Sequence, residues 1–60
     1  MEKLPFNLLI ADDDEINRLI SNKILEGYFN LIDFAANGVE ALDKIYTKAY
    51  DVILMDINGY

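Results

Sequence analysis

The chain has 60 residues, of which 53% are apolar, and this proportion favours one small folded domain over a disordered segment. Its net charge of −6 excludes nucleic acid as a partner, and no apolar stretch approaches the roughly 20 residues of a membrane-spanning helix. Cysteine and histidine are both absent, which excludes a disulfide framework and the usual zinc sites, so we expect a cytoplasmic domain.

The first half of the chain contains one predicted strand and one predicted helix. A continuous apolar run over about residues 7–11 is typical of a strand that is covered on both faces. Apolar residues then recur at helical spacing over about 15–26, and Asp14 is well placed to cap the start of this helix. Gly27 is the expected end of the helix.

The second half of the chain repeats this alternation and adds a strand. A less purely apolar strand, of the kind found at a sheet edge, is predicted over about 31–35. Asn37 and Gly38 usually signal a hairpin, but the apolar residues that follow recur at helical spacing and predict a second helix over about 39–48. A third strand, the most apolar after the first, is predicted over about 51–56.

The order β-α-β-α-β predicts the fold class. Strands that are joined by helical crossovers are parallel, and the crossovers are almost always right-handed. We therefore expect an α/β fold with one three-stranded parallel sheet over residues 1–60. The larger aromatic side chains are expected in the core or at its rim: Tyr28, Phe29, Phe34, Tyr46 and Tyr50.

Acidic residues stand at the carboxyl ends of two predicted strands. Asp12 and Asp13 follow the first strand and Asp56 closes the third. In open parallel sheets, ligands bind at these ends, so neighbouring strands would bring the three carboxylates together. Taken singly, the aspartates after the first strand are often only helix caps and an aspartate closing a strand is often a turn residue. Their joint occurrence favours a shared site.

Such a group of carboxylates predicts a cation site. Like charges held close together repel, and a cation between them relieves the repulsion. Mg²⁺ prefers oxygen ligands and is often bound by one or two carboxylates, phosphate oxygens and water. A carboxylate beside Mg²⁺ can also act as a nucleophile and form an aspartyl phosphate.

Three stretches resemble the receiver domain of bacterial two-component response regulators: "LLIADDDEINR", "AANGVEAL" and "YDVILMDI". They occur in the family's order and spacing, and the resemblance covers essentially the whole chain. It implies the N-terminal half of a flavodoxin-like, doubly wound fold, whose complete strand order is 2-1-3-4-5. It also implies a part in phosphorelay signalling and no enzymatic activity of the chain's own.

The resemblance assigns roles to four residues. Asp56 would be the phosphoacceptor, and Asp12 and Asp13 would bind Mg²⁺, Asp13 directly and Asp12 through water. Asn58 occupies the position whose backbone carbonyl completes the metal site. The phosphoryl donor would be a phosphohistidine on a sensor kinase or on a phosphotransfer protein.

The chain also departs from the family. Gly59 and Tyr60 stand where Met-Pro usually follows, and the Ser or Thr after strand four and the Lys after strand five have no counterpart. Switching is therefore expected to be lost, and the third strand becomes an exposed apolar edge. We expect a homodimer through this edge and the uncovered sheet faces, with strand order 2-1-3-3-1-2, and a domain swap is the competing geometry. The alternative function is a truncated or engineered half-fold that self-assembles without signalling.

Overall fold

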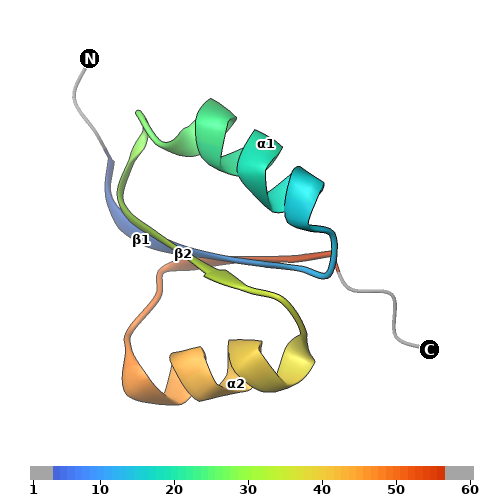
Figure 1. The fold of residues 1–60 in the computed structure, drawn as a ribbon. Helices are drawn as coiled ribbons and strands as arrows, with labels where there is room; N and C mark the ends of the chain where they lie inside the picture. The colour runs from blue at the N-terminus through green and yellow to red at the C-terminus, as the bar shows by residue number, and fades with distance from the viewer. Residues whose placement is uncertain (1–3, 57–60) are drawn as a thin grey trace.

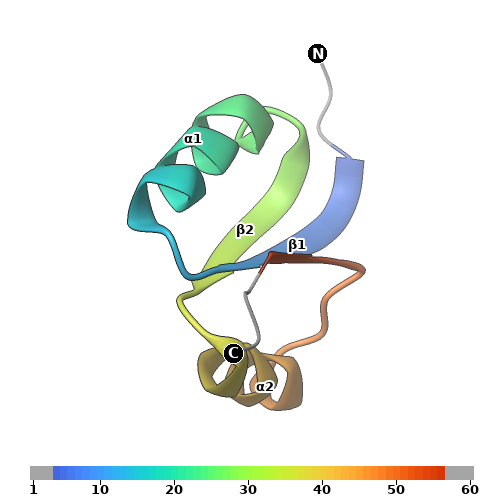
Figure 2. The same cartoon turned by 90° about the vertical axis from the view of Figure 1, so that its right-hand side faces the viewer.

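The computed structural model describes residues 4–56 of the chain, as a parallel sheet with one helix on each of its two faces (Figures 1 and 2). The elements in chain order are β1 Leu4–Asp12, α1 Glu15–Leu25, β2 Phe29–Ala35, α2 Gly38–Thr47 and β3 Val52–Asp56. The three strands have the order β2-β1-β3, and both pairs are parallel. The α/β fold and the order of elements predicted from the sequence are thus confirmed.

β1 is the central strand because the four apolar residues before its last aspartate are covered from both sides. Leu8 to Ala11 are each 3% exposed or less, and Leu8 and Leu9 are fully buried. On the α2 face, Leu9 and Ala11 pack with Ala41 of α2 and with Ala35 of β2. The small side chains at this contact let α2 lie close to the sheet, which gives the molecule its core.

The amino-terminal half of β1 is longer than the apolar run alone predicts. The strand begins at Leu4, and its pairing register with β2 shifts between Leu4 and Asn7. This irregularity accommodates Pro5, which has no backbone N–H to donate and is tolerated in sheets at such bulges. The other elements differ from the expected ranges by one or two residues at their ends, where helix and strand limits are least sharply defined.

Both helices begin at capped positions. Asp14 Oδ1 accepts hydrogen bonds from the backbone N–H of Ile16 at 2.9 Å and of Asn17 at 3.4 Å, as expected for the N-cap of α1. Asn37 Oδ1 accepts from the N–H of Glu40 at 2.9 Å and so caps α2. The Asn37-Gly38 pair therefore starts a helix and does not form a hairpin turn.

β3 is the least covered element of the described chain. It pairs only with β1, and within residues 4–56 neither helix contacts it. Its four apolar side chains are between 36% and 59% exposed. The apolar side of α1 is exposed as well, with Ile16, Leu19, Ile20 and Ile24 all above half.

The prediction that all of the larger aromatic residues belong to the core or its rim is wrong for two of them. Tyr46 is 84% exposed and Tyr28 is 45% exposed. The other three are less exposed and lie at the rim of the core: Phe29, Phe34 and Tyr50. Tyr46 follows Ile45 on α2, and successive helical side chains point about 100° apart, so Ile45, at 38% exposure, lies closer to the sheet than Tyr46 does. Among the described residues, no helix is long and apolar enough to cross a membrane.

Candidate functional site

Asp12 and Asp56 are direct neighbours at the carboxyl edge of the sheet. The β1–β3 register runs from Leu8 opposite Val52 to Asp12 opposite Asp56. Adjacent strands lie about 4.8 Å apart, and residues directly opposite each other in a parallel pair project to the same face. The acidic ends of the first and third strands are therefore adjacent in the fold, as the sequence predicts.

Asp12 is the one charged residue that the described fold buries, at 5% exposure. Its Oδ1 accepts a hydrogen bond from the backbone N–H of Asp14 at 2.9 Å, and this contact closes the turn between β1 and α1. Its backbone carbonyl accepts from Arg18 Nη1 at 2.6 Å. The carboxylate and the main chain of Asp12 are thus both fixed from the first turn of α1.

The three consecutive aspartates have three different environments. Asp14 caps α1, as described above, and Asp12 is turned into the fold. Asp13 lies between them and is exposed, as is Asp56 at the end of β3. Helix capping therefore accounts for Asp14 alone. Asp12 and Asp13 lie at the carboxyl end of β1, next to Asp56 at the end of β3.

The donor set suits Mg²⁺ by its chemistry. Within residues 4–56, no three acidic side chains are gathered closely enough to make a complete metal site on their own. Mg²⁺ does not require such a cage, because it keeps several waters and takes one or two carboxylates together with phosphate oxygens. The two carboxylates of Asp12 and Asp56, which are opposite each other at the ends of β1 and β3, fit that requirement. Asn58, the expected backbone ligand, lies outside the described residues.

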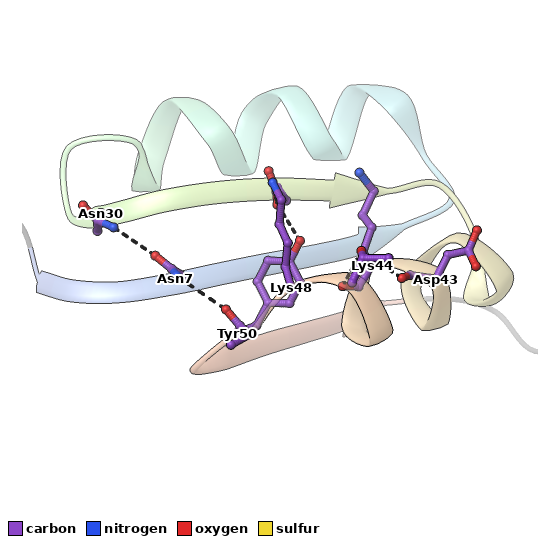
Figure 3. A network of polar contacts seen from close by, with 9 residues as sticks. Asn7, Asn30, Asp43, Lys44, Lys48 and Tyr50 are labelled. Atoms are coloured by element: carbon purple, nitrogen blue, oxygen red, sulfur yellow. Dashed lines mark hydrogen bonds and ion pairs between the residues drawn. The ribbon is translucent and has the colours of Figure 1, made fainter.

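A second polar cluster, which the sequence did not predict, lies on the α2 side of the sheet (Figure 3). Asp33 Oδ2 of β2 accepts hydrogen bonds from the Tyr50 hydroxyl and from Lys48 Nζ, the latter at 3.1 Å. The Tyr50 hydrogen bond, helped by Lys48 and opposed by burial, lowers the pKa of Asp33. Burial and the same carboxylate raise the pKa of Tyr50 to about 12.

This cluster joins β2 to the segment between α2 and β3. In the sequence, Asp33 only makes the predicted strand over 31–35 less purely apolar, as is typical of a sheet edge. The one feature of the sequence that indicates such a cluster is the pair of hydrogen-bond donors, Lys48 and Tyr50, just before the third strand. Their partner, however, depends on which strand lies opposite, and that is known only from the folded sheet.

Comparison with known proteins identifies one family, that of the receiver domain. The family model of the response regulator receiver domain matches residues 8–58. The chain is 40% identical to the sensor protein EvgS of Escherichia coli strain K12 over 57 residues, which are 95% of this chain and 5% of that protein.

Two further relatives give the same picture. The chain is 35% identical to the aerobic respiration control sensor protein ArcB of the same organism over 51 residues, 85% of this chain and 7% of that protein. It is 34% identical to histidine kinase 5 of Arabidopsis thaliana over 50 residues, 83% of this chain and 5% of that protein. The chain thus spans less than a tenth of the length of these relatives. No solved structure matches it.

Proposed function

Because this chain belongs to the response regulator receiver domain family of two-component signalling, we propose that it accepts a phosphoryl group on Asp56. The observation that carries the proposal is the β1–β3 register, which sets Asp56 directly opposite the buried Asp12. Asp56 is exposed at this edge, so a partner can reach its carboxylate.

The reaction is a phosphoryl transfer between two side chains. An Oδ atom of Asp56 attacks the phosphorus of a phosphohistidine, an O–P bond forms, and the N–P bond breaks. The imidazole leaves with the electron pair of that bond and takes up a proton from water. The product is an aspartyl phosphate. The chain acts as acceptor in this reaction, and we propose no turnover of its own.

Mg²⁺ is the proposed cofactor. Asp13 would hold it directly, Asp12 through a water molecule, and Asp56 and the backbone carbonyl of Asn58 would complete the protein ligands. When bound, the ion neutralises charge on the phosphoryl oxygens during transfer. The closeness of Asp12 and Asp56 supports this assignment, because a cation relieves the repulsion between two carboxylates on neighbouring strands.

The proposed donor is a phosphohistidine on a sensor kinase or a phosphotransfer protein. The relatives named above are a histidine kinase and two sensor proteins, and this supports a histidine-phosphorylated partner. The alternative function, a half-fold that assembles without signalling, finds no support in these relatives. We therefore do not propose it.

A second copy of the chain is a further proposed partner. The exposed apolar side chains of β3 make it a template for strand pairing. Two copies related by a twofold axis would set their β3 strands antiparallel, in the order 2-1-3-3-1-2. Size-exclusion chromatography with light scattering tests this arrangement, and a folded monomer at micromolar concentration would contradict it.

Phosphorylation is tested with a small phosphodonor, Mg²⁺ and intact-mass measurement. The parent chain is expected to gain the mass of one phosphoryl group, and the Asp56→Asn variant is expected to gain none. Removal of Mg²⁺ by a chelator should abolish the gain in the parent. A parent chain that stays unmodified at saturating donor would refute the proposed function.

A further inference from the structure

Asn7 of β1 is hydrogen-bonded to Asp51, the residue just before β3. The Asp51 backbone N–H donates to the Asn7 carbonyl at 2.9 Å, and the Asn7 backbone N–H donates to Asp51 Oδ2 at 2.9 Å. The Asn7 side chain also donates from Nδ2 to the Ala49 carbonyl at 3.4 Å. One residue of β1 thus makes three hydrogen bonds to residues 49 and 51, just before β3.

Asn7 is tied to the other neighbouring strand as well. Asn30 of β2 donates from Nδ2 to Asn7 Oδ1 at 3.0 Å. We call the three residues Asn7, Asn30 and Asp51 the Asn7 clamp. The clamp links β2, β1 and the residue before β3, and it lies at the opposite end of the sheet from Asp12 and Asp56.

Little else in the described chain specifies how β3 slides along β1. Register is strongly specified where one face of a strand is buried and weakly specified where neither is. β3 has only 5 residues, all exposed, and no helix of the described part contacts it. Its apolar side chains are of similar size and character, so a shifted pairing would lose few contacts.

The spacing along the two strands connects the clamp to the acidic edge. Asn7 precedes Asp12 by five residues, and Asp51 precedes Asp56 by five residues. A slip of one residue would turn the Asp56 side chain to the other face of the sheet. A slip of two would keep the face but carry Asp56 about 6–7 Å away from Asp12.

We propose that the Asn7 clamp sets the register of β3 and so positions Asp56 beside Asp12. The clamp residues touch neither phosphate nor metal, and they act through Asp56 as positioning residues. The importance of this position rests on the proposed function, whereas the register itself does not.

The contact between Tyr50 and Asp33 is the competing anchor. It also holds the segment before β3, but it fastens that segment to β2, two strands away from β3 in the sheet. The Tyr50 ring additionally packs against the core. Tyr50→Phe removes the hydroxyl and keeps the ring, so this variant separates the two anchors.

The test compares cross-strand nuclear Overhauser effects between β1 and β3 in isotope-labelled variants. In the parent chain, Ile10 opposite Leu54 and Asp12 opposite Asp56 define the native register. Asp51→Ala should weaken these signals or add a second set that corresponds to a shifted register. Asp51→Asn, which keeps an oxygen acceptor, should restore the single native set. Asp43→Ala is the matched control, since it removes an exposed carboxylate on α2 outside the clamp.

Mg²⁺ affinity gives the second readout. The dissociation constant should rise about threefold to tenfold in Asp51→Ala, which corresponds to the net loss of one hydrogen bond, and should recover in Asp51→Asn. If Asp51→Ala does not fold, Asn7→Ala replaces it, because it keeps the backbone N–H and loses the contacts with Ala49 and Asn30.

The outcomes separate the two proposals. One unchanged native set of signals in Asp51→Ala, or an equal disturbance in Tyr50→Phe, would overturn the clamp. A parent chain that shows the native register but neither binds Mg²⁺ nor takes up phosphate would refute the proposed function. In that case the signals of the Asp51 variants still decide whether the clamp sets the register.

Discussion

The Tyr50 hydroxyl donates a hydrogen bond to Asp33 Oδ2 across the face of the sheet that carries α2. The bond links residues 17 positions apart in sequence, and Lys48 shares the same oxygen atom. Asp33 is half-buried in β2, so its charge is only partly solvated. The hydroxyl and the ammonium group replace the lost water, which is why a carboxylate is tolerated within a strand.

Removal of the Tyr50 hydroxyl should destabilise the fold. Tyr50→Phe leaves the Asp33 carboxylate with one donor fewer, and we expect a loss of about 1–3 kcal/mol in the free energy of unfolding, the cost of removing one partner from a partly buried acceptor. Urea denaturation followed by circular dichroism measures the change. Tyr46→Phe is the matched control, because Tyr46 is 84% exposed, and it should change stability little. Equal losses in both variants would contradict the assigned bond.

The same pair should make stability depend on pH at both extremes. The pKa of Asp33 is lowered by the Tyr50 hydrogen bond, so its contribution is present above the ordinary pKa of 3.8 and is lost as the pH falls below that value. The pKa of Tyr50 is raised to about 12 by burial and by Asp33, so its contribution is present below 10 and is lost as the pH rises from 10 towards 12.

Titration of tyrosinate absorbance with parallel denaturation curves checks the alkaline limb. Tyr50→Phe should remove the component that titrates near 12 and flatten the stability curve between pH 10 and 12. Lys48→Met tests the contribution of the ammonium group at the acid limb, where the loss of stability below pH 3.8 should become smaller because the pKa of Asp33 would lie closer to its ordinary value. An alkaline limb that persists unchanged in Tyr50→Phe would show that another tyrosine causes it.

The separate environments of Asp13 and Asp14 lead to opposite variant effects. Asp14→Ala removes the N-cap of α1 and should cost about 1 kcal/mol of stability, with little change in Mg²⁺ affinity. Asp13→Ala should leave stability in metal-free buffer nearly unchanged and should weaken Mg²⁺ binding strongly. Calorimetric titration and thermal denaturation of the two variants, side by side, measure both quantities. The same pattern in both variants would show that capping and metal binding are not divided as described.

Much of the fold follows from the sequence through a few rules. Helical crossovers make the strands parallel, and a continuous apolar run places the first strand in the centre, so the meeting of Asp12 with the end of the third strand could be expected. The helix that starts at Asn37-Gly38 is predictable because the spacing of the apolar residues after this pair is helical. These features depend on the local spacing of apolar residues, which is visible in the sequence itself.

The polar contacts could not be predicted in the same way. Asn7 with Asp51, and Asp33 with Tyr50, are pairs whose members are far apart in sequence and meet only in one strand register. The pairing register of a strand depends on turn geometry and on which face is buried. The sequence of an exposed strand such as β3 indicates neither of these. The prediction that Tyr46 belongs to the core or its rim is wrong for a related reason, since the exposure of Tyr46 depends on the direction in which α2 lies on the sheet.

Mg²⁺ should stabilise the folded chain if the acidic edge binds it. A ligand that binds only the folded form adds about 1.4 kcal/mol at ten times its dissociation constant. Thermal denaturation should therefore shift upwards through millimolar Mg²⁺ and return on addition of a chelator. Asp13→Asn should abolish the shift, and Asp43→Asn, which alters an exposed carboxylate on α2, should keep it. A melting temperature that does not respond to Mg²⁺ in the parent would mean that the edge does not bind the ion.

The pairing of Asp12 with Asp56 should be unfavourable when no cation is present. Like charges directly opposite each other on neighbouring strands destabilise a sheet by up to about 1 kcal/mol, and the exposure of Asp56 places the effect towards the lower end. Asp56→Asn should accordingly raise stability in metal-free buffer at neutral pH. The gain should shrink in high salt, since screening weakens the repulsion that the variant removes.

Mg²⁺ should reverse the order of stability of the two proteins, because the parent binds the ion more tightly than Asp56→Asn does and is stabilised more by it. Denaturation curves with and without Mg²⁺, at low and high salt, give the four values that are needed for each protein. Asp51→Asn serves as the control, since it removes one negative charge from β3's entry without altering the acidic edge. An Asp56→Asn variant that is less stable than the parent in metal-free buffer would show that the carboxylate has a structural partner stronger than its repulsion from Asp12.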